Sequence, residues 1–237
     1  MQVWQEDMLT ALEAPLLTEG EIFQRLSVAS EALGFDYCAY GLRVPIPVTR
    51  PQVIVLSNYP EAWQRRYHEA GYIAIDPTVI RGRKSQTPVL WSDALFADAT
   101  NLWDEARAFG LRVGWAQSSL DGHGIGGMVT LARSHDEITP AELAAKELRM
   151  RWLVNMAHLA FSRKISPRLV QPSSELTKRE IEVLQWTADG KTAPEIGDIL
   201  EVSHHTVVFH VSNAMRKLNA SSRTAAAVKA AMLGLLN

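Results

Sequence analysis

Aromatic side chains with polar edges are concentrated in the first half of the chain, at a density that packing alone does not require. They are Tyr59, Trp63, Tyr67, Tyr72, Trp91, Trp103 and Trp115. Trp63 and Tyr67 are four residues apart, so they share one face of a helix, and Asp76 adds a carboxylate. Indole and phenol groups donate hydrogen bonds to carbonyl oxygens, and a carboxylate accepts one from an amide N–H. This combination predicts a cavity with aromatic walls that suits a small amphiphile, part amide or lactone and part hydrocarbon.

The elements that must position these residues form a mixed pattern. Helices are expected over 18–33, from Pro60, from Asp76, over 100–109 and from Thr139, and strands over 35–43, 53–57, 111–120 and 124–132. Thr139 with Glu142 has the spacing of a capping box, and Asp76 before Pro77 is typical of a helix start. One face of the helix from Thr139, long enough to cover a sheet or a partner subunit, carries Ala141, Ala145, Leu148, Trp152, Met156 and Leu159. The sequence therefore predicts an α/β/α sandwich with an antiparallel sheet.

Two prolines and three serines interrupt the patterned sequence over 166–174. We interpret this segment as a linker between a domain of residues 1–165 and a second domain of residues 175–237. The second domain is predicted to be all-α, with four short helices. Their expected N-caps are Thr177, Thr192, Ser203 and either Ser221 or Ser222. A tight turn separates the second helix from the third, which is the arrangement of a helix-turn-helix. The predicted fold class is thus α+β.

The third helix of the second domain has two distinct faces. Its inward stripe is Val207, Val211, Ala214 and Leu218, and its outward stripe is His205, Val208, Phe209, Ser212 and Arg216. The net charge of −2 for the whole chain at first argues against nucleic acid as a partner. Within residues 175–237, however, every acid lies at or before Glu201, and four bases follow it. The third helix and its flank therefore form the basic face that phosphates would meet.

Residues 176–219 resemble the DNA-binding domain of the LuxR family of quorum-sensing regulators, a four-helix helix-turn-helix unit. The resemblance implies structural roles for Glu180, Leu184 and Gly190. It implies base contacts for Val208 and Ser212, and phosphate contacts for Thr206, Lys217 and Arg223. Val208 stands where many relatives have a polar or basic residue, so it offers an apolar contact, for example to a thymine methyl group.

The aromatic segment resembles the N-acyl-homoserine-lactone-binding domain of the same family. Residues 58–79, Trp91, Gly110-Leu111 and Gly114 carry this resemblance. It implies that the Trp63 indole donates to the lactone carbonyl and that Asp76 accepts the amide N–H. It also implies that Tyr59, helped by Thr130, bonds the acyl carbonyl. The other wall residues that it implies are Tyr67, Thr78, Trp91, Leu102, Trp103, Ala106 and Leu111.

The resulting hypothesis is a ligand-dependent homodimeric transcription factor of the bacterial cytoplasm. Its expected partners are double-stranded DNA with a palindromic site, an N-acyl-homoserine lactone as autoinducer, and RNA polymerase. No cofactor, metal or membrane is expected, nor any catalytic residue. The chain has 237 residues, 47% apolar and 21% charged, which is typical of a globular protein. Its single cysteine, Cys38, permits neither an internal disulfide nor a CxxC metal site.

Three alternatives stay open. An orphan regulator would answer to a different small amphiphile. An acyl-lactone hydrolase would use the cluster Ser118, Ser119, Asp121 and His123, but the chain has no G-x-S-x-G nucleophile elbow, and residues adjacent on a hairpin rarely form a triad. A phosphorylation-controlled response regulator shares this type of DNA-binding domain. Its receiver would be a parallel α/β unit, which the pattern before the linker does not indicate.

Overall fold

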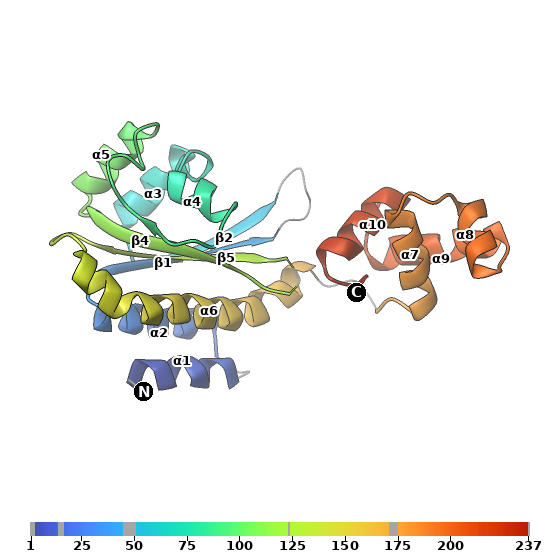
Figure 1. Cartoon of the computed structure of the whole chain (residues 1–237), viewed down its shortest axis with the longest axis horizontal. Coiled ribbons are helices and arrows are strands. Elements are labelled where there is room, and N and C mark those ends of the chain that lie inside the picture. Colours follow the sequence, from blue (N-terminus) through green and yellow to red (C-terminus); the bar gives the residue numbers. More distant parts are fainter. Residues whose placement is uncertain (1–2, 14–16, 45–50, 123, 171–174, 237) are drawn as a thin grey trace. The chain divides into compact units, whose positions relative to one another are not determined.

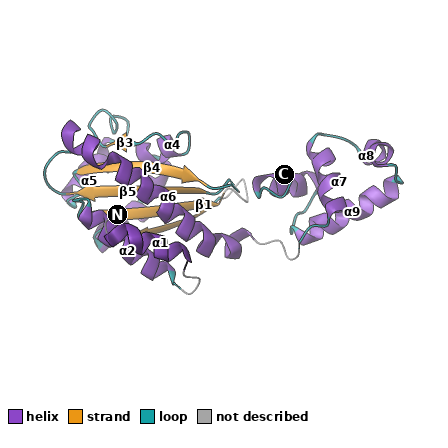
Figure 2. Cartoon of the chain, turned by 60° about the horizontal axis from the view of Figure 1, so that its bottom comes forward, coloured by secondary structure: helices purple, strands orange, loops and turns teal. Residues whose placement is uncertain are grey.

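The computed structural model describes residues 3–13, 17–44, 51–122, 124–170 and 175–236. They divide into two compact units, and in the second half of the chain the boundary falls between Ile165 and Ser166. The first unit combines helices with a sheet, and the second is helical (Figures 1 and 2). This confirms the predicted α+β class.

A five-stranded sheet forms the middle layer of the first unit (Figure 2). Its strands are β1 (Tyr37–Val44), β2 (Gln52–Ser57), β3 (Val89–Leu90), β4 (Val113–Leu120) and β5 (Gly126–Arg133), in the order β2-β1-β5-β4-β3. β5 pairs antiparallel with both β1 and β4, and β3 pairs antiparallel with β4. The sequence predicts the four longer strands to within about two residues at each end. It misses β3, because two residues are too few to show an alternating pattern.

Helices cover both faces of this sheet, as predicted (Figure 1). One face carries α3 (Glu61–Glu69), the 3-10 turn η1 (Tyr72–Ala74), α4 (Pro77–Gly82) and α5 (Thr100–Ala108). The other face carries α2 (Glu19–Ala32) and α6 (Pro140–Val170), and α1 (Val3–Glu13) lies outside them. Burial alternates along β1, because successive residues face the two helical layers in turn. The buried residues are those on the side of α6, such as Tyr40.

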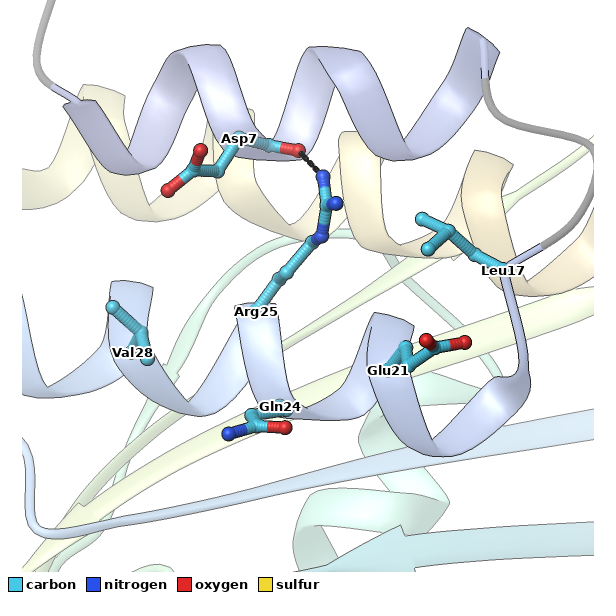
Figure 3. A pocket seen from close by; sticks show the side chains of 6 residues that line it. All are labelled: Asp7, Leu17, Glu21, Gln24, Arg25 and Val28. Carbon is cyan, nitrogen blue, oxygen red and sulfur yellow. Dashed lines mark hydrogen bonds between the residues drawn. The ribbon is translucent and has the colours of Figure 1, made fainter.

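A hollow of about 250 Å³ lies at α1 and α2 (Figure 3). Its lining residues are Asp7, Leu17, Glu21, Gln24, Arg25 and Val28. Arg25 Nη1 donates to the Asp7 carbonyl oxygen across it, at 2.5 Å. Four of the six lining residues are charged or polar, and none of the six is aromatic. It therefore does not match the amphiphile cavity that the sequence predicts.

The face of α6 that covers the sheet differs from the predicted one. The buried residues of α6 include Met150, Leu153, Val154, Ala157 and Phe161, and the ring of Tyr40 on β1 stacks on Phe161 with centroids 4.2 Å apart. The predicted stripe lies at the surface in part, since Leu148 is 81% exposed. Trp152 of that stripe meets Trp4 of α1 at 5.7 Å between ring centroids. That stripe therefore does not cover the sheet.

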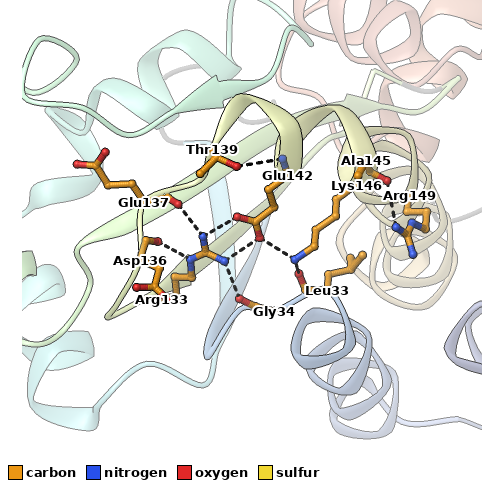
Figure 4. A network of polar contacts seen from close by, with 10 residues as sticks. All are labelled: Leu33, Gly34, Arg133, Asp136, Glu137, Thr139, Glu142, Ala145, Lys146 and Arg149. Carbon is orange, nitrogen blue, oxygen red and sulfur yellow. Dashed lines mark hydrogen bonds and ion pairs between the residues drawn. The ribbon is translucent and has the colours of Figure 1, made fainter.

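The start of α6 is held by an ion-pair network instead of a complete capping box (Figure 4). The Glu142 N–H donates to Thr139 Oγ1 at 3.1 Å, as predicted. The Glu142 carboxylate, however, accepts two bonds from Arg133, at 2.9 and 2.8 Å, and one from Lys146 at 2.6 Å. Arg133 and Lys146 also donate to backbone carbonyls at the end of α2. A buried guanidinium is a stronger donor than a backbone N–H, so it takes the carboxylate away from the cap.

The end of α6 corrects the predicted linker. The helix runs to Val170 and thus includes residues 166–170, while 171–174 lie outside the described residues. A single proline removes one intrahelical hydrogen bond and costs about 3 kcal/mol, which is too little to end a helix of 31 residues with buried residues from Met150 to Ile165.

The second unit contains the four predicted helices. They are α7 (Lys178–Ala188), α8 (Ala193–Leu200), α9 (His204–Lys217) and α10 (Arg223–Met232). Thr177 and Thr192 form complete capping boxes, and Ser203 accepts from the N–H of Thr206. Ser222, the second of the two candidates, caps α10. The core consists of Val183, Ile196, Val207 and Val211, with Trp186, Ala193, Leu200, Val202 and Met215 packed against it.

Candidate ligand site and nucleic-acid interface

An aromatic cluster lies on the face of the sheet that carries α3 and α5 (Figure 1). Trp63 on α3 is at its centre and is 3% exposed. Its ring centroid is 5.8 Å from that of Tyr67, 6.0 Å from that of Tyr72 and 5.6 Å from that of Phe109. Edge-on and tilted contacts at these distances are favourable for aromatic pairs. The helical spacing of Trp63 and Tyr67 therefore brings them together as predicted.

Asp76 joins this cluster to the start of α4. Its Oδ1 accepts from the Thr78 backbone N–H at 2.8 Å and from the Thr78 hydroxyl at 2.6 Å. Its Oδ2 accepts from the Tyr67 hydroxyl at 2.9 Å. Burial and the nearby Asp76 carboxylate raise the pKa of Tyr67, so the phenol stays protonated and donates. Asp76 is thus the predicted N-cap and also contacts the aromatic cluster.

Trp91 and Trp103 form a second part of the cluster, with ring centroids 5.9 Å apart. Trp91 lies directly on the backbone of β4, because a Cβ on Gly114 would be 2.2 Å from its ring. The Trp103 Nε1 donates to Asp93 at 2.7 Å. The Trp91 Nε1, by contrast, is buried and has no hydrogen-bond partner among the described residues.

Register places Thr130 on the same face as this cluster. Thr130 lies opposite Ala116 on β4, so both side chains point to the same face of the sheet. Ala116 is two residues from Gly114, so this is also the face on which Trp91 covers Gly114. Trp115 points to the opposite face, where α6 packs. Its assignment to the aromatic walls is therefore wrong, because successive residues of a strand face opposite sides of the sheet.

Three polar groups of the predicted lactone contacts lack an internal partner. In the described part of the chain, neither the Tyr59 hydroxyl, nor the Trp63 indole N–H, nor the Thr130 hydroxyl makes a hydrogen bond to a protein group. Burial raises the pKa of Tyr59, so its hydroxyl also remains a donor. None of these three is among the fully buried polar atoms without a partner, so each is open to solvent at least in part and has hydrogen-bonding capacity left for a ligand.

The structure brings most of the predicted ligand residues together. Trp63, Leu102, Trp103, Ala106 and Leu111 belong to one buried cluster, and Tyr59, Tyr67 and Trp91 pack against it. Asp76 and Thr78 join it through Tyr67. Sequence reasoning missed Tyr37, Phe96 and Phe109, which belong to the same cluster. The alternating pattern of the first strand was a signal for Tyr37, whereas nothing local marks Phe96 or Phe109.

The outward stripe of α9 is exposed as predicted. Val208 is 48% exposed and Phe209 is 62% exposed, and His205, Ser212 and Arg216 are exposed as well. The turn before α9 is tight, because a Cβ on Gly197 of α8 would lie 2.7 Å from the Val202 carbonyl oxygen. This contact is the reason for glycine within α8, and it fixes α9 against α8.

All three predicted phosphate contacts also have structural partners. Lys217 Nζ pairs with Glu180 at 2.8 Å, where the Glu180 side chain is 4% exposed. Arg223 Nη2 donates to the Lys191 carbonyl oxygen at 2.5 Å. Thr206 is bonded to the N-cap Ser203. These residues hold the second unit together, and their contacts with DNA stay predictions.

The two serines of the hydrolase alternative are bonded to different partners. The Ser118 hydroxyl donates to the Ser85 carbonyl at 2.9 Å, and the Ser119 hydroxyl donates to Asn155 at 2.9 Å. As neighbours on β4 they face opposite sides of the sheet. His123 lies outside the described residues.

The described ranges lack two further kinds of feature. They contain no group of three or more His, Cys, Asp or Glu side chains placed to hold a metal ion. Nor do they contain a helix whose length and hydropathy match a membrane span.

Comparison with known proteins covers nearly the whole chain. Residues 18–161 match the family model of the autoinducer binding domain, and residues 174–230 match that of the bacterial regulatory proteins of the luxR family. The transcriptional activator protein AnoR of Acinetobacter nosocomialis is 44% identical over the full length of both chains. The crystal structure of Escherichia coli SdiA superposes with a TM-score of 0.86 at 35% identity, covering 99% of this chain and 98% of that one.

A second SdiA structure, in complex with octanoyl-rac-glycerol, has a TM-score of 0.85 at 36% identity and covers 100% of this chain and 99% of that one. The segment that matches the autoinducer binding domain contains the aromatic cluster. The segment that matches the luxR regulatory proteins contains α9 with its exposed face. The chain belongs to the LuxR family of quorum-sensing transcriptional regulators.

Proposed function

We propose that the first unit binds an N-acyl-homoserine lactone at the aromatic cluster. The observation that carries this proposal is the grouping of unpartnered donors with one carboxylate. The Trp63 indole bonds the lactone carbonyl, Asp76 accepts the amide N–H, and Tyr59 with Thr130 bonds the acyl carbonyl. The unpartnered groups of Tyr59, Trp63 and Thr130 and the second lone pair of Asp76 Oδ2, beside the bond from Tyr67, support these roles. Tyr67, Thr78, Trp91, Leu102, Trp103, Ala106 and Leu111 form the walls.

A different acyl amphiphile is the second candidate ligand. The related SdiA has been solved in complex with octanoyl-rac-glycerol, which carries an acyl chain and polar head group but no amide. The donors of Tyr59 and Trp63 would serve such a head group, whereas Asp76 would lose its amide partner. The two ligand classes therefore differ in their dependence on Asp76.

The second unit binds double-stranded DNA through α9. Val208 and Ser212 reach the base edges, and His205, Phe209 and Arg216 lie on the same outward stripe. Thr206, Lys217 and Arg223 contact the phosphates. The exposure of the first group and the absence of acids after Glu201 support this assignment.

The protein acts as a homodimer on a palindromic site. The exposed side of α6, with Leu148 and Leu159, and the exposed Val228 of α10 are the candidate dimer surfaces. Apolar residues at such positions are typical of subunit contacts. The complex acts in the bacterial cytoplasm, with RNA polymerase as its partner, and performs no catalysis.

Mass spectrometry of protein expressed with a mixture of lactones tests the ligand proposal. We expect one N-acyl-homoserine lactone to be retained at near one molecule per chain by the wild type and lost from Trp63→Ala. Retention of a monoacylglycerol alone would favour the second candidate. Retention of neither compound would contradict both.

A further inference from the structure

A row of polar side chains bonds the second half of α6 to the end of the β4–β5 hairpin. Asn155, His158 and Ser162 are spaced by three and four residues, so they lie on one side of the helix. Asn155 Oδ1 accepts from the Ser119 hydroxyl at 2.9 Å, and the Ser162 hydroxyl donates to Asp121 Oδ2. His158 lies between these two contacts along the helix and is 1% exposed. The row therefore holds the hairpin end on α6, with His158 at its centre.

Both ring nitrogens of His158 are bonded, which fixes a neutral tautomer. Nε2 is 3.1 Å from the Ile125 carbonyl oxygen, which can only accept, so we assign the ring proton to Nε2. Nδ1 is then an acceptor, and the Tyr40 hydroxyl donates to it at 2.9 Å. The Tyr40 ring is held in turn by its stacking on Phe161. Every bond of this network thus matches the uncharged imidazole.

A second proton on the imidazole would have no partner in this network. An Nδ1–H would point at the hydroxyl hydrogen of Tyr40, which would have to turn away and give up its bond. The ring also lies directly on β5, because a Cβ on Gly127 would be 2.1 Å from Nδ1, so no water molecule fits between them. A buried charge without hydration or a counter-ion is strongly unfavourable.

Two titratable groups of the described residues face the imidazole. Tyr40 comes from β1, and burial raises its pKa, so it carries no negative charge. Asp121 follows β4, and its oxygens already accept from the Ser162 hydroxyl and the Ile125 N–H. β5 contributes the uncharged Ile125 carbonyl. Burial outweighs the attraction of Asp121 and holds the pKa of His158 below its ordinary value.

We infer that this junction is a pH-sensitive lock between α6 and the β4–β5 hairpin, closed while His158 is neutral and opened by its protonation. The unfolded imidazole takes up a proton at a higher pH than the buried one. The stabilising effect of the lock is therefore complete above about pH 6.5 and is lost as the pH falls below it. The Glu142 network keeps its effect down to a pH of about 4.5, so it still holds the start of α6 in mild acid. Mild acid thus releases the hairpin end while α2 stays in place.

Hydrogen exchange of the full chain at about pH 7.5 and about pH 5.5, corrected for the intrinsic exchange rate, tests this inference. The backbone N–H groups of Asp121 and Ile125 each donate to an oxygen of the other residue, so they report the hairpin end. The N–H groups of α2 report the rest of the first unit. For the wild type we expect the protection of the hairpin end to fall in mild acid, by up to about tenfold per pH unit. The protection of α2 should change little.

His158→Gln is the central variant, because its amide supplies a donor and an acceptor but does not titrate. Its hairpin end should have the same protection at both pH values. His68→Gln is the matched control, since His68 is exposed on α3, and it should keep the wild-type fall. Tyr40→Phe keeps His158 and removes the donor to Nδ1, so the fall should begin at a higher pH.

Three results would overturn the inference. They are a wild type without any fall at the hairpin end, an equal fall in the wild type and His158→Gln, and an equal fall at the hairpin end and in α2. If His158→Gln did not fold, Tyr40→Phe would decide in its place, because an onset at the wild-type pH would contradict the role of the Tyr40 bond in the lock.

Discussion

The Tyr67 hydroxyl donates a 2.9 Å hydrogen bond to Oδ2 of Asp76, whose Oδ1 is occupied by Thr78. One carboxylate therefore caps α4 and orients a ring of the aromatic cluster at the same time. A carboxylate oxygen has two lone pairs, so Oδ2 keeps one for a ligand amide. The bond from Tyr67 thus sets the direction in which Asp76 presents that lone pair.

Tyr67→Phe is expected to weaken lactone binding by about tenfold to a hundredfold, because it removes one hydrogen bond to a charged group. The ring contact with Trp63 remains. Tyr72→Phe is the matched control, since the Tyr72 ring touches the same Trp63 ring, but its hydroxyl bonds Arg66 and not the Asp76 carboxylate. Isothermal titration with N-octanoyl-homoserine lactone measures the difference. Equal losses in both variants would show that the bond to Asp76 plays no part in binding.

The Glu142 network predicts a loss of stability in acid. The hydrogen bond from Arg133 is the largest cause that lowers the pKa of Glu142, from 4.5 to about 2. Its stabilising effect is complete above the unfolded value and disappears as the pH falls from about 4.5 toward 2. The full effect is on the order of 3 kcal/mol.

Urea unfolding of the wild type and Glu142→Gln between pH 6 and about 3 checks this. We expect Glu142→Gln to be less stable at pH 6, with a shallower loss in acid. Glu147→Gln is the control, because Glu147 makes a more exposed pair with Arg151. Parallel acid profiles for the wild type and Glu142→Gln would refute the assignment.

Lys217 is predicted to matter for folding independently of DNA. Its removal leaves the buried Glu180 carboxylate without its cation, which typically costs about 3 to 5 kcal/mol. Lys217→Met should therefore lower the melting temperature of the protein without DNA. Glu180→Gln added to Lys217→Met should recover most of that loss. A stable Lys217→Met protein with weakened DNA binding would instead indicate a phosphate contact alone.

Val208 is predicted to read thymine through its methyl group. Uracil lacks this methyl group and keeps every hydrogen-bonding group of thymine. In an operator selected from random DNA, one thymine-to-uracil replacement per half-site should weaken wild-type binding several-fold. Val208→Ala should bind more weakly and lose this sensitivity, whereas Ser212→Ala should keep it. A wild type that binds every uracil-substituted operator with full affinity would exclude methyl readout.

Local signals predicted much of this fold. Capping boxes at Thr177 and Thr192 mark helix starts because their partners lie within one turn. The alternation of β1 likewise depends on adjacent residues. The partner of Glu142 could not be predicted, because Arg133 comes from another element and competes with the helix's own backbone N–H.

The site was predicted less completely than the fold. Trp63, Tyr67 and Asp76 lie within fourteen residues, and helical spacing brings them together. Thr130 joins the same face only through the register of β4 and β5. Register depends on the whole sheet, and a shift by one residue would turn Trp115 toward the ligand and Thr130 away from it.

The proposed binding of a lactone to the first unit through Trp63 and Asp76 predicts that the ligand raises the stability of the protein. Thermal unfolding of the full chain with and without N-octanoyl-homoserine lactone measures this gain. At a hundredfold excess over Kd, binding adds about 2.7 kcal/mol of stability, so the wild type should melt several degrees higher. Trp63→Ala and Asp76→Ala should show no such shift. A wild type whose melting temperature does not respond, or variants that respond equally, would contradict this account.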